Sequence, residues 1–241
     1  RRERDRSFAL LDAAFELGCT TLDCAHGYGG GDSERAIGEW MQARGNRDKV
    51  VILTKGCHPN GDRLRVTPFD LLADLHDSLA RLKTDHIDIY LLHRDNPAVP
   101  VGEIVGMLNE QLNAGRVRAV GVSNWRHERI EEANRYAAAH NLAPIVASSP
   151  HFSLAEQVEN PWGPGCVGIS GPKEVEVRAW YAKNGMAVFA YSSLARGLFS
   201  GRITRRNFAE IKDKIDGACV RAYCHECNFQ RLDRAEQLAR E

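Results

Sequence analysis

Residues 50–55 read Val-Val-Ile-Leu-Thr-Lys, an apolar run that is unbroken for four residues and ends in a lysine. A strand of a parallel sheet is covered on both faces, so it carries continuous apolar residues instead of an alternating pattern. Other short segments of the chain share this character. The strands predicted in this way are residues 20–23, 50–55, 87–93, 117–124, 144–149 and 186–191.

Longer amphipathic segments fill the gaps between these strands. In one of them Thr67 stands before Pro68, which is typical of an N-cap followed by proline in the first turn of a helix. Leucines recur behind this pair at helical spacing, namely at Leu71, Leu75, Leu79 and Leu82. Further helices are expected at residues 8–15, 98–114, 127–140, 173–184 and 229–240, and a long loop at residues 159–172. The alternation of strand and helix predicts an α/β protein with a parallel sheet.

A parallel sheet is either doubly wound or closed into a barrel, and the glycines help to decide between the two. A dinucleotide-binding doubly wound sheet carries Gly-x-Gly-x-x-Gly directly after a strand. Residues 27–31 read Gly-Tyr-Gly-Gly-Gly. Counted from Gly27 the third required glycine falls on Asp32, and counted from Gly29 it falls on Glu34. This sequence therefore does not carry the fingerprint.

Polar side chains stand at the end of each predicted strand. They are Asp23, Lys55, His93, Asn124, Ser149 and Tyr191. In a (β/α)8 TIM barrel the functional residues lie at the C-terminal ends of successive strands, so this pattern favours the barrel. We expect a single domain over residues 1–241 that lacks the first and last strands and is truncated at both ends. Because such a barrel could not close, residues 1–241 expressed alone are expected to be poorly soluble or inactive.

Composition excludes several classes of partner. The 32 Lys and Arg residues balance the 32 Asp and Glu residues, so no global field attracts nucleic acid or an anionic membrane. No apolar stretch is long enough for a transmembrane helix. Seven cysteines without framework spacing favour reduced thiols and a cytoplasmic location. Residues 224–227 read Cys-His-Glu-Cys, but a second cysteine pair is missing from the sequence, so no metal is expected.

Several segments resemble the aldo-keto reductase family. Residues 23–28 read Asp-Cys-Ala-His-Gly-Tyr where that family has Asp-Thr-Ala-x-x-Tyr, and residues 33–38 read Ser-Glu-Arg-Ala-Ile-Gly where it has Ser-Glu-x-x-(Ile/Leu)-Gly. The family's third, fourth and fifth strands end in lysine, histidine and Ser-Asn, as residues 53–55, 88–93 and 120–124 do here. In this order on successive strands, the segments make the resemblance specific.

The resemblance implies an oxidoreductase that transfers a hydride reversibly between a nicotinamide cofactor and an aldehyde or ketone. Reduction leaves an alkoxide that needs a proton, and tyrosine, with an ordinary pKa of about 10, is a poor acid at neutral pH. A neighbouring ammonium favours the phenolate and makes a tyrosine more acidic. By resemblance, the catalytic residues are Tyr28 as general acid and base, Lys55 beside it, Asp23 paired with Lys55, and His93 orienting the carbonyl.

The cofactor residues follow from the same resemblance. Ser123 and Asn124 are expected to bind the nicotinamide carboxamide, and Tyr191 to stack on its ring. Ser192, Ser193, Leu194 and Gly197 belong to a loop that resembles the family's loop along the pyrophosphate. The sixth strand departs from the pattern, because Ser148 and Ser149 stand where the family has Asn-Gln, and serine has a shorter reach. NADPH is favoured and NADH is possible.

Two other functions fit parts of the same pattern. A non-catalytic, nucleotide-binding regulatory member of the same fold would keep the architecture without turnover. A barrel aldolase would use Lys55 as a Schiff base. Small aldehydes, ketones or sugar-derived carbonyls are the expected substrates, and His26 and His58 are candidates for lining the substrate mouth. The sequence sets neither the physiological substrate nor the oligomeric state.

Overall fold

A computed structural model describes residues 2–241, with side chains from Arg4 onward. The chain forms two compact units. The first holds the residues up to Ser123 together with Glu128–Ala147, and the second holds Asn124–His127 with Ser148–Glu241. Among the residues described, no helix combines the length and apolar character needed to cross a membrane.

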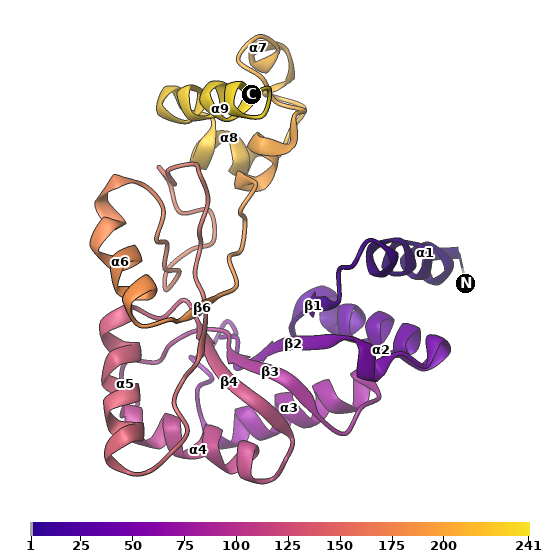
Figure 1. Cartoon of the computed structure of the whole chain (residues 1–241), viewed down its shortest axis with the longest axis vertical. Coiled ribbons are helices and arrows are strands. Elements are labelled where there is room, and N and C mark those ends of the chain that lie inside the picture. The colour runs from indigo at the N-terminus through magenta and orange to yellow at the C-terminus, as the bar shows by residue number, and fades with distance from the viewer. Residues whose placement is uncertain (1) are drawn as a thin grey trace. The chain divides into compact units, whose positions relative to one another are not determined.

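The first unit is built on parallel strands that follow one another in chain order (Figure 1). They are β1 (Thr21–Asp23), β2 (Val51–Gly56), β3 (Ile87–Leu92) and β4 (Val117–Ser123). In the register, Asp23 lies opposite Leu53 and Lys55 opposite Leu91. Because neighbouring strands run parallel, their C-terminal ends meet at one edge of the sheet. The predicted strands and the α/β class are therefore confirmed in this unit.

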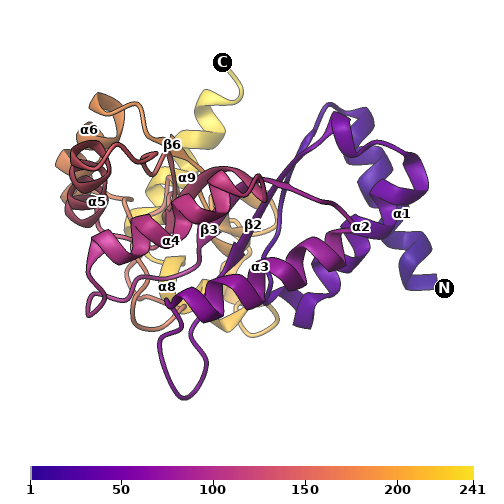
Figure 2. The ribbon, with the colours of Figure 1, turned by 90° about the horizontal axis from the view of Figure 1, so that it is seen from below.

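Helices connect these strands and cover them. They are α1 (Arg2–Glu16), α2 (Asp32–Arg44), α3 (Pro68–Leu82), α4 (Val101–Asn113) and α5 (His127–Ala139). Helix α3 lies against β2 and α4 against β4, and Figure 2 shows both helices on the same side of the strands. The N-cap expected at Thr67 is confirmed, because its Oγ1 accepts a hydrogen bond from the Asp70 amide at 3.2 Å. Helix α4 starts later than expected, because Pro100 occupies its N-cap position.

The second unit contains short strands and several small helices. Its elements are β5 (Ala147–Ser149), the 3-10 turn η3 (Pro172–Glu174), α6 (Val175–Lys183), β6 (Ala187–Val188), the 3-10 turn η4 (Ala195–Ser200), α7 (Phe208–Ile211), α8 (Gly217–Tyr223) and α9 (Glu226–Leu238). The Phe189 amide donates to Ser148 O at 2.9 Å and the Tyr191 amide to Pro150 O at 3.2 Å. The expected strand at 186–191 is thus reduced to two residues, although its neighbours continue the backbone pairing. Helices α7 and α8 were not predicted.

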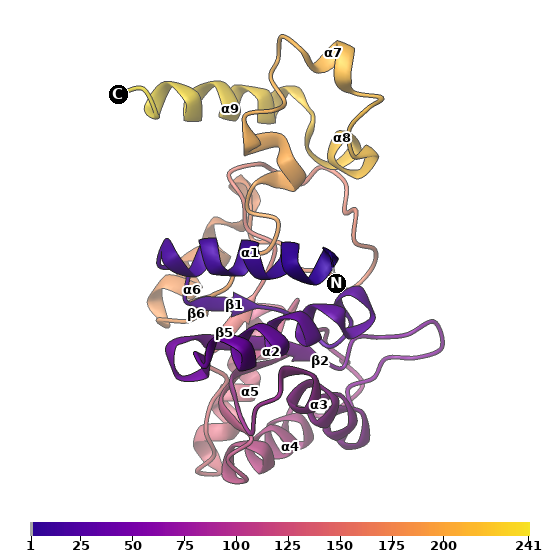
Figure 3. The same cartoon turned by 90° about the vertical axis from the view of Figure 1, so that its right-hand side faces the viewer.

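Helices α2 and α3 pack closely in the first unit, as Figure 3 shows. The backbones approach each other closely at Gly38 of α2. A Cβ atom placed there would lie 2.2 Å from the backbone oxygen of Arg81 and 2.7 Å from the carbonyl carbon of Leu82. Neither atom belongs to a flexible side chain. Glycine at this position therefore lets the backbones of the two helices touch.

We predict that Gly38→Ala destabilises the protein. Overpacking of this kind costs about 1–3 kcal/mol, which exceeds the gain of about 0.5–1 kcal/mol from replacing a helical glycine by alanine. Urea unfolding followed by circular dichroism measures the difference. Gly106→Ala in α4 is the matched control, because a Cβ there has no heavy atom within 4 Å, and it should stabilise. Equal effects of the two substitutions would contradict the close packing of α2 on α3.

Candidate active site

A buried lysine lies at the end of β2. The side chain of Lys55 is only 3% exposed, and its Nζ forms an ion pair with Asp23 Oδ1 at the end of β1. The same Nζ donates a hydrogen bond to the backbone oxygen of Cys24 at 3.0 Å. A buried ammonium is costly unless it is paired and hydrogen-bonded. The two acceptors at the end of β1 therefore hold the ammonium in one place.

The ring of Tyr28 lies beside this ammonium. Lys55 Nζ is 5.2 Å from the centre of the Tyr28 ring. On another side the ring meets His93 edge to face, with the ring centres 5.7 Å apart and an interplanar angle of 77°. Tyr28 nevertheless stays 42% exposed. A small molecule from solvent can therefore reach a tyrosine that is flanked by a lysine and a histidine.

His93 follows β3 and is buried. Its ring packs edge to face against His58, with the ring centres 4.6 Å apart. Burial lowers the pKa of His93 to about 2, and the charges of His58 and Lys55 act in the same direction. The imidazole is therefore neutral at physiological pH. A neutral imidazole has one donor nitrogen and one acceptor nitrogen, so it can donate a hydrogen bond to a carbonyl oxygen.

The turn that carries Tyr28 depends on three glycines. Gly29, Gly30 and Gly31 have φ values of 59°, 63° and 95°, a left-handed run that side chains disfavour. The Tyr28 amide donates to Ala25 O at 3.1 Å, which closes the turn before it. Helix α2 starts directly after the run, at Asp32. The glycine cluster thus forms the 3-10 turn η1 (Tyr28–Gly31) that connects the tyrosine to α2.

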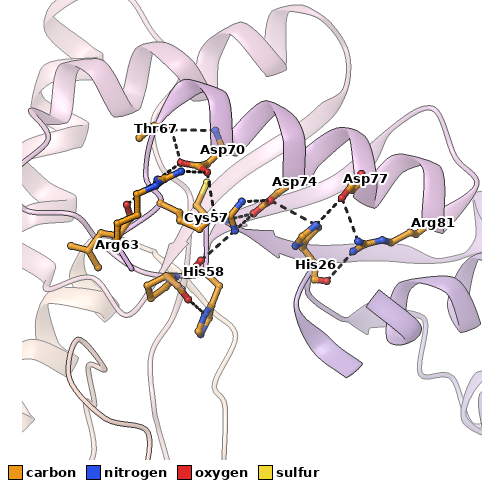
Figure 4. A network of polar contacts seen from close by, with 12 residues as sticks. His26, Cys57, His58, Arg63, Thr67, Asp70, Asp74, Asp77 and Arg81 are labelled. Carbon is orange, nitrogen blue, oxygen red and sulfur yellow. Dashed lines mark hydrogen bonds and ion pairs between the residues drawn. The ribbon is translucent and has the colours of Figure 1, made fainter. Parts of the chain in front are cut away.

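Helix α3 presents a polar network to the residues that follow β1 and β2 (Figure 4). His26 Nε2 lies 3.1 Å from Asp77 Oδ2, and its backbone oxygen accepts from Arg81 Nη1 at 2.9 Å. The Cys57 amide donates to Asp74 Oδ2 at 2.8 Å. Of the two histidines expected near the substrate mouth, His58 packs against His93, whereas the side chain of His26 contacts α3.

The second unit gathers most of the residues expected to bind the cofactor. Asn124 adopts a left-handed backbone with φ of 61°, and its Oδ1 accepts from Tyr191 Oη at 2.8 Å and from the Val167 amide at 3.1 Å. Its own amide donates to Ser149 O at 3.3 Å. Ser149 is buried. Asn124, Ser149 and Tyr191 are therefore neighbours in this unit, and Ser123, the last residue of β4, directly precedes Asn124 in the chain.

The loop after Tyr191 has an unusual backbone. Ser192, Ala195, Arg196 and Gly197 all have positive φ, at 53°, 50°, 52° and 107°. Leu194, directly before this run, has φ of −86° and ψ of 16°. Two amides of this loop are bonded within it, because Ala195 N–H donates to Ser192 O at 2.8 Å and Gly197 N–H donates to Leu194 O at 3.0 Å. The backbone oxygen of Ser193 accepts a hydrogen bond from Ser153 Oγ at 2.8 Å.

The cysteine-rich segment is also in the second unit. Cys219 and Cys224 are buried with their Sγ atoms 3.9 Å apart, and Cys227 is exposed. Across residues 4–241, no group of three or more His, Cys, Asp or Glu side chains is placed to hold a metal ion.

Comparison with known proteins gives a consistent result. A sequence model of the "Aldo/keto reductase family" matches residues 1–241. The chain is similar to Aldo-keto reductase YhdN of Bacillus subtilis (strain 168), with 31% identity over 217 residues, covering 86% of this chain and 57% of that protein. It is also similar to Aldo-keto reductase yakc [NADP(+)] of Schizosaccharomyces pombe, with 30% identity over 198 residues, covering 80% and 53%.

A solved structure matches as well. It is that of a "putative 2,5-diketo-D-gluconic acid reductase B", with a TM-score of 0.62 and 29% identity, covering 80% of this chain and 59% of that one. The chain spans about half the length of the curated relatives it matches. These matches confirm the resemblance found in the sequence and the expected fold class of a TIM-barrel reductase.

We predict that His93 does not titrate in the physiological range. Its folded pKa of about 2 lies below the value of about 6.5 for an unfolded chain. Above pH about 6.5 the imidazole is neutral in both the folded and the unfolded chain. As the pH falls from there toward about 2, the unfolded chain takes up a proton and the folded chain does not, so the free energy of unfolding decreases. NMR of labelled histidine should show no protonation of His93 between pH about 8 and 5. A midpoint near 6.5 would contradict its burial as a neutral ring.

Proposed function

The chain belongs to the aldo/keto reductase family, and on that premise we propose that it reduces aldehydes or ketones with a nicotinamide cofactor, in a reversible reaction. The observation that carries the proposal is the grouping of Asp23, Lys55, Tyr28 and His93 in one unit. A buried ammonium, a tyrosine open to solvent and a neutral histidine are the groups that protonation of a nascent alkoxide needs.

Tyr28 is the proton donor in this proposal. Hydride addition to a carbonyl carbon places negative charge on the oxygen, and the Tyr28 hydroxyl transfers its proton there. Lys55 stabilises the negative charge that develops on the tyrosine oxygen, because its ammonium lies beside the ring. Asp23 keeps that ammonium at the end of β1. The neutral His93 donates a hydrogen bond to the carbonyl oxygen and thereby fixes its direction.

The residues of the cofactor site carry separate tasks. Ser123 and Asn124 would hold the carboxamide and Tyr191 would contact the nicotinamide ring, which would supply the hydride when bound. Support comes from the Asn124–Tyr191 hydrogen bond, which fixes the tyrosine. Ser149 assists with a shorter side chain than the family has there. The cofactor site of the proposal is completed by the pyrophosphate loop, with Ser192, Ser193, Leu194 and Gly197.

The pyrophosphate assignment rests on backbone conformation. What supports it is the run of positive φ at Ala195, Arg196 and Gly197, together with the resemblance of the loop to the family's loop along the pyrophosphate. We propose NADPH as the preferred form of the cofactor, with NADH possible, because the yakc relative carries NADP(+) in its name.

The substrate in this proposal is a small carbonyl compound. The similar protein whose structure is solved is named for a diketo acid derived from a sugar. Sugar-derived carbonyl compounds are one of the substrate classes expected from the sequence. A cytoplasmic location and the exclusion of nucleic acid as a partner stay predictions from composition.

We predict that Tyr28→Phe abolishes most of the turnover. The substitution keeps the ring and removes the proton, so kcat should fall by at least the roughly 10²-fold typical of a general acid. Affinity for the cofactor should stay nearly unchanged, because the ring remains. Steady-state kinetics of the full-length protein with a test aldehyde, together with fluorescence titration of NADPH, measures both. Near-normal kcat would refute the role of Tyr28, and absent turnover in the unaltered protein would favour a non-catalytic member of the family.

A further inference from the structure

Arg81 lies near the C-terminal end of α3 and is the centre of a set of contacts that the catalytic account does not use. Its side chain is 17% exposed. Nη1 donates to the backbone oxygen of His26 at 2.9 Å and Nη2 to Asp77 Oδ2 at 3.3 Å (Figure 4). Nη1 also donates to Glu34 Oε2 at 3.3 Å. The guanidinium therefore binds three acceptors from three parts of the first unit.

The residues that Arg81 contacts lie before and after Tyr28 in the sequence. His26 stands two residues before the tyrosine, and Glu34 stands six residues after it. Between them, a Cβ atom at Gly31 would lie only 2.7 Å from Arg81 Cζ, so the guanidinium packs directly on the backbone of the turn. The 3-10 turn that carries Tyr28 is thus held before, at and after its glycines by a single side chain.

Glu34 also connects the turn of Tyr28 with β2, the strand that carries Lys55. Its carboxylate is fully buried, and Oε1 accepts a hydrogen bond from Thr54 Oγ1 at 2.6 Å. Thr54 is the residue before Lys55. A buried carboxylate needs a cationic partner, and Arg81 is the cation that contacts it here. The contacts Arg81–Glu34–Thr54 therefore connect the turn of Tyr28 with the strand of Lys55.

We propose that Arg81 is a positioning residue for the proton donor, which sets the place of Tyr28 relative to Lys55. This inference rests on the proposed function. Arg81 acts through the His26 carbonyl and through Glu34, and does not touch the reacting atoms. A displacement of about 1 Å at a catalytic group can cost up to about 10²-fold in rate, so a rigid anchor on the turn has a direct kinetic effect.

Arginine suits this task better than lysine does. Its planar guanidinium presents five donors in a fixed fork, whereas an ammonium is a compact point charge on a flexible stem. Lysine at position 81 would still place a positive charge near Glu34. It could not contact His26 O, Glu34 and Asp77 in the same geometry. Arg81→Lys therefore separates the positioning of the turn from the neutralisation of the buried carboxylate.

The test compares Arg81→Lys with Arg47→Lys in the full-length protein. Arg47 is a matched control, because its side chain is 19% exposed and binds Thr84 Oγ1, His86 O and Asp88 Oδ2. These partners lie near the N-terminal ends of β2 and β3, away from Tyr28 in the first unit. Both variants should lose some thermal stability, since both give up a fork of hydrogen bonds.

Only Arg81→Lys should change catalysis. We expect kcat to fall about tenfold with the cofactor dissociation constant unchanged within about twofold. The solvent deuterium isotope effect on kcat should rise, because proton donation becomes slower. Hydrogen exchange of the amides at residues 26–31 should accelerate in Arg81→Lys and stay normal in Arg47→Lys. An equal loss of kcat in both variants, or unchanged kcat and exchange in Arg81→Lys, would overturn the proposal.

Two further outcomes are decided by additional measurements. If the unaltered protein shows no turnover, the proposed function fails, and hydrogen exchange of the turn alone decides whether Arg81 positions it. If Arg81→Lys does not fold, the double variant Glu34→Gln with Arg81→Met replaces it, because it leaves no unpaired buried charge. That variant should show the same fall in kcat and the same faster exchange, and normal values of both would overturn the proposal.

Discussion

The ion pair between Lys55 and Asp23 is the interaction on which the rest of the site depends. An ammonium removed from water must find fixed acceptors, and parallel pairing of β1 with β2 places a carboxylate and a backbone oxygen beside it. The cation is then close to the one tyrosine that the following turn brings back to the end of the strands. The chemistry proposed for Tyr28 follows from that arrangement.

The helix layer adds a second constraint. Gly38 lets α2 approach the backbone of α3, and Gly31 leaves space for the guanidinium of Arg81. Gly31 ends the turn of Tyr28 and Gly38 lies in α2, which follows that turn directly, so the packing of the two helices and the place of the tyrosine are coupled. Helix α2 also supplies Glu34, which contacts the strand of Lys55 through Thr54. Packing and catalysis thus share residues in this unit.

Much of this architecture could be predicted from the sequence, because continuous apolar runs such as residues 50–55 identify buried parallel strands and polar residues at their ends identify a common edge. The strand at 186–191 was predicted longer than β6, although the amides of Phe189 and Tyr191 continue its pairing to Ser148 O and Pro150 O. Arg81 could not be found in this way, because its partners come from three separate segments. Glu34 did carry a signal, as a charged residue at helical spacing with the buried Ile37 and Met41.

The measurement that tests the account most directly is a double-mutant cycle on kcat/KM with Asp23→Asn, Lys55→Met and the double variant. If Asp23 serves mainly to hold Lys55, removing either residue removes the function of the pair, and the double variant should be little worse than the poorer single one. The account predicts this non-additive result. Fully multiplicative losses would show that the two residues act independently, and would contradict a catalytic centre built on their ion pair.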